Sequence, residues 1–216
     1  MIKKLNIHQV AWYFLLFSIF GMILENITCL VMSGIIESRK GFIIGPFCPI
    51  YGLGAILLIL CLEPFKNNKF KVFIYGMIVG AGFEYFSSYA MQAIYGVKFW
   101  DYPNYFLNIN GRTCLMYAVS WGILSLILIY LAKPAIDVFI KKMYSIKLDK
   151  IIIGFMIADA CVTFITINSF MRRVELEYTY NKYTDGIVSN VAMKKIFPNM
   201  IYVPLNGKQK LTAKIM

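Results

Sequence analysis

Three acidic side chains stand inside long apolar stretches of this sequence. They are Glu25, Glu84 and Asp159. A charged group at the centre of a bilayer costs at least about 2.5–3.5 kcal/mol, so it normally faces protein or water. Carboxylates at that depth need a cation, a proton or polar partners. Three interpretations follow: a fixed ion-pair network that holds helices together, a ligand or ion site, or the acid/base centre of an enzyme.

Helical spacing surrounds Glu84 with small and polar side chains. The residues at intervals of four on its face are Gly76, Gly80, Ser88 and Gln92. The two glycines permit the close approach of a second helix, as small residues at this spacing do in membrane bundles. The other acids have comparable neighbours: Gly21 and Cys29 for Glu25, and Thr163 and Thr166 for Asp159.

Arg112 is the basic residue expected to meet these acids. If the N-terminus is cytoplasmic, Glu25 lies about 22 Å and Glu84 about 18 Å from the cytoplasmic edge at the helical rise. Arg112 begins a predicted helix on the same outer side, and a guanidinium can pair with a carboxylate through two hydrogen bonds. We therefore expect Arg112 to converge with both acids, and Asp101 to lie at the rim. The other candidates for this polar site are Tyr51, Gln92, Asn108, Asn110 and Asp159.

The stretch GFIIGPFCPIYGLG, residues 41–54, is expected to form one wall of such a site. It is apolar, yet it carries four glycines and two prolines. Proline lacks a backbone donor and disfavours helical geometry in the residue before it. A regular helix from Pro49 to Leu62 spans about 21 Å, short of the hydrocarbon layer of about 30 Å. We expect the first half to be irregular and to line a cavity; a Pro-kinked helix or an apolar surface loop is the alternative.

The composition is that of a membrane protein. Hydrophobic residues make up 59% of the chain and charged residues 15%, against about half and a quarter in soluble domains. The predicted fold class is all-α, a polytopic transmembrane helix bundle with about five crossings and a Pro/Gly-broken second segment. The predicted crossings are residues 9–33, 41–63, 72–95, 113–131 and 150–171, with Pro134 stopping the fourth helix. Residues 1–173 form the transmembrane helical domain and residues 174–216 a polar C-terminal tail, in which 174–180 is either a strand or a continued helix.

The net charge of +11 is concentrated in short segments between apolar runs. Lysines gather near the N-terminus and in the loops at 64–71 and 132–149, which predicts that these segments are cytoplasmic and that the loop at 96–112 is not. The expected location is the cell membrane, with the lipid bilayer as a partner and no nucleic acid. The five cysteines form no CxxC pair and there is one histidine, so we expect no metal site and no cofactor.

Motifs of familiar enzyme classes are missing from the sequence. There is no GxxxxGK[ST] loop, so the chain does not bind ATP in that way, and HExxH and GxSxG are also absent. No nucleophile is marked by an adjacent base. An enzyme is therefore the least favoured of the three interpretations.

A set of short motifs, in order and at matching spacing over about residues 14 to 135, resembles a known family. The family comprises bacterial multipass proteins, the CmpB-like, type IV group of ABC-transporter permeases, and the vertebrate transmembrane protein 229 group is a more distant relative. The matching residues are Gly21 with Glu25, Gly41-Phe42, Gly45-Pro46, Pro49-Ile50-Tyr51-Gly52, Glu84-Tyr85, Trp100-Asp101-Tyr102, Asn108, Asn110-Gly111-Arg112, Cys114-Leu115, Trp121-Gly122 and Pro134. Two positions depart from the family pattern: Met22 replaces an aromatic residue, and Gln92 stands where a second glutamate is expected.

The resemblance implies a permease-like transport component, with a polar site toward the non-cytoplasmic side and a separate ATP-binding subunit or a second copy of the chain as partner. The expected structural motif residues are Gly45, Pro46, Pro49, Gly52, Trp100, Tyr102 and Gly111. Two alternatives stay open. One is a membrane protein that binds lipid or a partner without transport, and the other is an intramembrane enzyme that uses Glu25 or Glu84 as acid and base.

Overall fold

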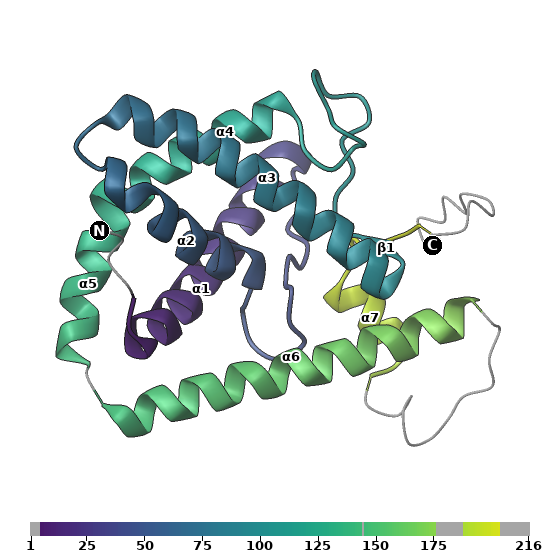
Figure 1. Cartoon of the computed structure of the whole chain (residues 1–216). Coiled ribbons are helices and arrows are strands. Elements are labelled where there is room, and N and C mark those ends of the chain that lie inside the picture. The colour runs from purple at the N-terminus through teal and green to yellow at the C-terminus, as the bar shows by residue number, and fades with distance from the viewer. Residues whose placement is uncertain (1–4, 144, 176–187, 204–216) are drawn as a thin grey trace.

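The structure is a computed structural model that describes residues 5–143, 145–175 and 188–203. This described part is built from α-helices and one two-stranded sheet (Figure 1). Within it, three helical stretches are long and apolar enough to cross a membrane: Ile7–Ser33, Leu115–Lys142 and Lys147–Val174. An all-α fold with helices able to cross a membrane is therefore confirmed, whereas the number of five crossings stays a prediction.

Helix α1 (Ile7–Ser33) and helix α2 (Pro49–Leu62) pack against each other. The Asn6 side chain caps α1 by accepting a hydrogen bond from the Gln9 amide, which satisfies one of the free donors of the first turn. Helix α2 begins at Pro49, at a position where a missing backbone N–H leaves no hydrogen bond unmade. Residues 41–48 before it are not helical, so the predicted break in the second segment is confirmed.

Helix α3 (Lys69–Tyr95) packs against helix α4 (Leu115–Ile127) through the glycine face expected from the spacing. Gly80, Glu84 and Ser88 are all buried on α3. A Cβ atom at Gly80 would collide with the Trp121 side chain of α4. The two helices approach as closely as a glycine allows, and the same face of α3 becomes polar from Glu84 onward.

The helical stretch that begins with α4 continues past Pro134 to Lys142, so the prediction that Pro134 stops the fourth helix is wrong. The chain passes through a π-helical turn (Leu128–Ala132) into helix α5 (Lys133–Lys142), which turns away from the direction of α4 (Figure 1). In a regular α-helix, proline removes one hydrogen bond and its ring crowds the carbonyl four residues earlier. A π turn directly before Pro134 opens the helix at that point, and such turns are established causes of helix bends.

Helix α6 (Ile146–Glu175) runs along one side of the molecule (Figure 1). It begins beside the start of α1 and ends near helix α7 (Asn190–Ile196). The helix continues past Arg173 to Glu175, as one of the two alternatives for residues 174–180 expected. Residues 176–187 lie outside the described part of the chain.

Part of the predicted polar tail packs against the helices. Strand β2 (Ile201–Tyr202) pairs antiparallel with strand β1 (Val97–Lys98), which follows α3. A buried apolar cluster joins this sheet to the end of α6 and to α7; its members include Val97, Phe170, Met193 and Phe197. The division into a helical domain and a tail stays a prediction, but residues 190–202 are part of the packed structure.

The end of the bundle at which α1 begins is held by charged side chains that pair with one another. Asp149 of α6 accepts a hydrogen bond from Trp12 Nε1 at 3.1 Å and lies 2.7 Å from His8 Nδ1. On α5, Asp137 binds Lys133 at 2.8 Å. Both carboxylates thus have a basic partner, and we call this cluster of five residues the paired end.

Candidate functional site

A cavity of about 710 Å³ lies at the other end of the bundle, among the C-terminal halves of α1 and α3 and the start of α2. Four of the predicted polar residues line it: Glu25, Tyr51, Glu84 and Asp101. Pro49, Trp100 and Tyr102, predicted as structural motif residues, line it as well. These residues come from four separate segments of the sequence, and the structure places them around one cavity. We call this end of the bundle the cavity end.

Glu84 is the more deeply buried acid of the cavity end, with 6% of its surface exposed. Its Oε2 accepts a hydrogen bond from Thr113 Oγ1 at 2.7 Å, and its Oε1 accepts one from the Tyr102 hydroxyl at 3.4 Å. Burial and the adjacent Glu84 carboxylate raise the pKa of Tyr102, so this phenol keeps its proton and acts as a donor. Thr113 was missed by the sequence reasoning, although it directly follows Arg112.

Glu25 is half-buried on α1 and faces α2. The Tyr51 hydroxyl donates to Glu25 Oε1 at 2.6 Å. The Tyr51 ring lies against Gly21, one turn before Glu25, where any Cβ atom would collide with it. The same ring stacks on Trp121 with centroids 6.0 Å apart. Glycine at position 21 is thus what allows Tyr51 to reach the carboxylate.

Neither cavity carboxylate has a basic partner. Among the described residues, no Lys, Arg or His nitrogen lies within 4.0 Å of Glu25 or Glu84. The cations that line the cavity in this part of the chain are Arg39 and Lys40. Sequence reasoning counted these two only as loop charges, although they directly precede Gly41 at the start of the irregular segment. Two hydroxyl-bound acids in one cavity, with cations at a distance, form a site suited to a positively charged group.

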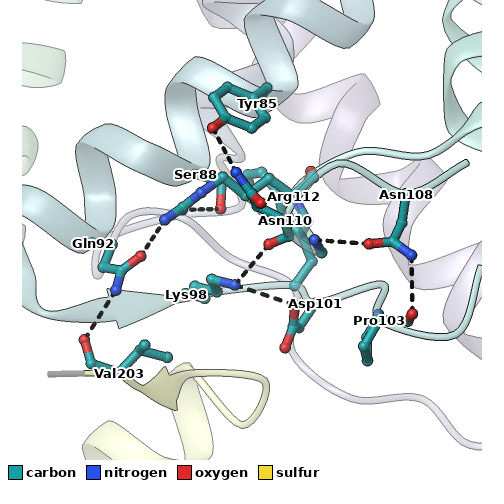
Figure 2. A network of polar contacts seen from close by, with 12 residues as sticks. Tyr85, Ser88, Gln92, Lys98, Asp101, Pro103, Asn108, Asn110, Arg112 and Val203 are labelled. Atoms are coloured by element: carbon teal, nitrogen blue, oxygen red, sulfur yellow. Dashed lines mark hydrogen bonds and ion pairs between the residues drawn. The ribbon is translucent and has the colours of Figure 1, made fainter. Parts of the chain in front are cut away.

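Arg112 does not pair with the acids, so the predicted convergence with Glu25 and Glu84 is wrong. Its guanidinium is buried and donates to Ser88 Oγ at 3.0 Å and to Gln92 Oε1 (Figure 2). Both acceptors lie on α3, one and two turns beyond Glu84. The guanidinium carbon also lies 5.8 Å and 5.5 Å from the ring centroids of Tyr85 and Tyr89, within the range of cation–π attraction. The long arginine side chain therefore points away from Glu84, along the polar stripe of the same helix.

The remaining loop residues hold the segment between α3 and α4 in place (Figure 2), and of these Asp101 also lines the cavity. Lys98 Nζ donates to Asp101 Oδ1 and to the Asn110 carbonyl oxygen, both at 3.2 Å. The Asn110 side chain donates to the Tyr85 hydroxyl at 3.1 Å, and Asn108 accepts from the Gly111 amide at 3.2 Å. The charge of Asp101 is thus paired with Lys98, and its position at the rim of the site stays a prediction.

Gly111 carries the tight turn of this loop. Its φ of 68° is in the left-handed region, which glycine adopts without the clash that a Cβ atom causes. A side chain there would also collide with the Asp101 carboxylate. The turn places the Arg112 carbonyl oxygen 2.8 Å from Trp100 Nε1, which donates to it.

Asp159 supports the irregular segment and is not part of the cavity lining. Its side chain is fully buried, and its Oδ1 accepts from the Ile44 amide at 3.0 Å. One turn further on α6, Thr163 Oγ1 accepts from the Ile43 amide at 3.0 Å. Non-helical backbone at membrane depth needs such partners because lipid offers none. Asp159 and Thr163 therefore act as the anchor of residues 43–44.

The glycines of the broken segment have separate roles. Gly45 has a φ of 73° and turns the chain directly before Pro46. Gly52 lies on α2 against α1, where a Cβ atom would collide with Ser18 and with the Phe14 backbone. Together they bring the irregular segment back to α1, where the Cys48 amide donates to the Ser18 carbonyl oxygen at 2.9 Å.

Within the residues that the structure describes, no group of three or more His, Cys, Asp or Glu side chains is placed to hold a metal ion. The two cavity acids are held by hydroxyl groups, and Cys29 is bound by Arg39 Nη2 at 3.1 Å. These contacts suit binding of an organic or hydrated cation better than direct ligation of a metal.

Comparison with known proteins places the chain in a family. The family described as Putative ABC-transporter type IV matches residues 12–164, a stretch that includes both cavity acids and Arg112. No curated protein and no solved structure matches the chain. The more distant relation to the transmembrane protein 229 group stays a prediction. Because the match covers well over half of the 216 residues, this membrane protein belongs to the Putative ABC-transporter type IV family.

Proposed function

We propose that the chain is a permease-like transport component of the cell membrane and that the cavity is its ligand site. The observation that supports this most is the pair of acids, Glu25 and Glu84, which share a cavity without a basic partner among the described residues. At the paired end the buried acids carry basic partners, and Asp159, which has none among the described residues, accepts a hydrogen bond from a backbone amide. Glu25 and Glu84 instead bind hydroxyl groups and line the open cavity. Family membership adds the expectation of transport.

The orientation in this proposal has the N-terminus in the cytoplasm and the cavity open to the other side. It rests on the lysines of the loops at 64–71 and 132–149. In a Cys-free background, Asn104→Cys and Asn67→Cys place exposed thiols at opposite ends of the bundle. A membrane-impermeant maleimide added to intact cells is expected to label position 104 and not position 67. The reverse pattern would contradict the proposed orientation.

ATP hydrolysis in this proposal belongs to a separate subunit, because the sequence has no phosphate-binding loop of its own. The test is purification of the tagged chain from its native membranes in a mild detergent, with an unrelated multipass protein carrying the same tag as control. We expect a subunit with a GxxxxGK[ST] motif in a fixed ratio to the chain, together with ATP hydrolysis by the complex. A chain that purifies as itself alone, with no ATP hydrolysis, would exclude this form of transport and leave a ligand-binding membrane protein.

A further inference from the structure

The cavity has an apolar edge on the outer surface of the helices. Three of its lining residues are large, apolar and more than half exposed: Met32 of α1 at 65%, Leu53 of α2 at 52% and Phe86 of α3 at 67%. Exposed apolar side chains on a membrane bundle contact lipid chains rather than water. The cavity is therefore continuous with the lipid-facing surface, an opening that a water-soluble ligand does not need.

The interior of the cavity combines acids with aromatic rings. Tyr51 stacks on Trp121, and Tyr102 stacks on Tyr117 with centroids 4.2 Å apart. All four rings line the cavity together with the two acids. Aromatic faces attract ammonium groups, and carboxylates add charge-assisted hydrogen bonds to any N–H. This half of the cavity matches a primary or quaternary ammonium group.

The other half of the cavity carries positive charge. Arg39 contacts the thiol of Cys29, which lies on α1 one turn, about 6 Å, beyond Glu25. Nη2 of Arg39 lies 3.6 Å from a Glu37 carboxylate oxygen, whereas its Nε atom is buried and has no hydrogen-bond partner among the described residues. Lys40 lines the cavity beside it. A guanidinium with a free N–H next to a lysine is a favourable setting for a phosphate or carboxylate group.

From these three observations we propose that the cavity binds an amphiphile with a zwitterionic head group, in the manner of a phospholipid whose phosphate carries an ethanolamine. The ammonium group lies between Glu25 and Glu84 among the aromatic rings, and the phosphate lies against Arg39 and Lys40. The hydrocarbon chains leave the cavity past Leu53 and Phe86 into the bilayer. This inference rests on the proposed function only in taking the cavity as the ligand site.

The test is native mass spectrometry of the delipidated, full-length protein titrated with three lipids that have the same acyl chains. Phosphatidylethanolamine has both charges, phosphatidylglycerol has the phosphate alone, and diacylglycerol has neither. We expect phosphatidylethanolamine to bind at least tenfold more tightly than either of the others. Equal affinity for phosphatidylglycerol would overturn the proposal, and this comparison uses the unaltered protein.

Displacement by free phosphoethanolamine distinguishes a lipid ligand from a soluble ligand with the same head group. It is expected to displace the bound lipid only at concentrations at least a hundredfold higher, because it lacks the chains that cover the apolar edge. Displacement at equal concentrations would show that the ligand is soluble and would overturn the lipid part of the proposal.

Variants of Glu25 and Glu84 test whether these acids bind the lipid head group. The double change Glu25→Gln and Glu84→Gln is expected to lower the affinity for phosphatidylethanolamine at least tenfold. Glu63→Gln, a change of the same kind at the far end of α2, is expected to leave it unchanged. Unchanged binding in the double variant would overturn the proposal. The subunit purified with the chain is a separate readout, so the failure of this inference and the failure of the transport function can be told apart.

Discussion

Asp149 and Glu84 are both acids buried in the same helix bundle, and each accepts hydrogen bonds from two side chains. The partners of Asp149 include the His8 imidazole, and nearby Asp137 is bound by Lys133. The partners of Glu84 are the hydroxyl groups of Thr113 and Tyr102. Exposure does not explain the difference, because Asp149 and Glu84 are each 6% exposed.

In the proposed function, this difference separates an acid that stabilises the fold from one that binds a ligand. Transfer of a carboxylate from water into protein costs several kcal/mol unless a basic group compensates it. At the paired end the protein supplies that group itself. At the cavity end it supplies neutral donors and an open volume, so the compensating charge is left to whatever enters the cavity.

The largest effect is expected from Asp149→Ala. The change removes the acceptor of His8 Nδ1 and of Trp12 Nε1, although His8 Nε2 keeps its contact with the Ile140 carbonyl oxygen. An unmade hydrogen bond of a buried donor costs about 1–3 kcal/mol. We expect the free energy of unfolding in detergent micelles to fall by about 3 kcal/mol. The neighbouring change Lys150→Ala, at an exposed position, is the control and is expected to stay within about 0.5 kcal/mol. Equal losses for the two changes would show that Asp149 does not stabilise the paired end.

Arg112→Lys comes next and concerns a buried cation of the cavity end that does not line the cavity. A lysine keeps the charge but cannot bind Ser88 and Gln92 through a planar fork, so we expect a loss of about 2 kcal/mol. Because Arg112 acts through these two acceptors, the loss in a Glu84→Gln background is expected to agree within about 0.5 kcal/mol. A clearly smaller loss in that background would show that Arg112 works through Glu84 after all.

Tyr13 at the paired end and Tyr51 at the cavity end allow the loss of one hydroxyl group to be compared between the two ends. Tyr13 is fully buried and its hydroxyl binds Asp137, whereas the Tyr51 hydroxyl binds the half-buried Glu25. Tyr13→Phe is expected to cost about 1.5 kcal/mol of stability, and Tyr51→Phe about 0.5 kcal/mol because water can replace the lost donor. Thermal unfolding of both variants measures the contrast. A larger loss of stability for Tyr51→Phe than for Tyr13→Phe would contradict the expected contrast between the two ends.

An effect smaller than that of Tyr13→Phe is expected at the anchor of the irregular segment. Thr163→Val removes the acceptor of the Ile43 amide, and we expect a loss of about 1 kcal/mol together with faster hydrogen exchange at Ile43. Thr166→Val is the matched control, because the Thr166 hydroxyl binds a carbonyl oxygen of its own helix. If exchange at Ile43 is the same in both variants, Thr163 does not hold the segment.

The sequence was sufficient for features that depend on local geometry. Pro49 begins α2 and Leu62 ends it, as expected from the proline positions and the length of the apolar run. Spacing alone identified the buried face of α3 from Gly76 to Ser88. Both features follow from rules that act within one helix.

The errors arose where a contact depends on three-dimensional arrangement. Helical depth placed Arg112 near Glu84 but could not show that its side chain extends along α3 to Gln92. The rule that proline stops a helix does not take into account the π turn before Pro134, which lets the helical stretch continue. The pairing of β1 with β2 joins residues about a hundred positions apart, and neither two-residue strand has a recognisable pattern of its own.

The central claim is that Glu25 and Glu84 have no compensating cation in the part of the chain that the structure describes, and the double change Glu25→Gln and Glu84→Gln tests it most directly. At each position the amide keeps one acceptor oxygen, and at position 84 its NH2 group can donate to the second hydroxyl oxygen, while the charge is removed. The measurement is the free energy of unfolding in lipid-free detergent, compared with that of Asp149→Ala. We predict that the double variant is as stable as the unaltered protein or more stable, within about 1 kcal/mol. A loss of about 3 kcal/mol or more, as expected for Asp149→Ala, would show that the acids hold the fold together and would contradict the account.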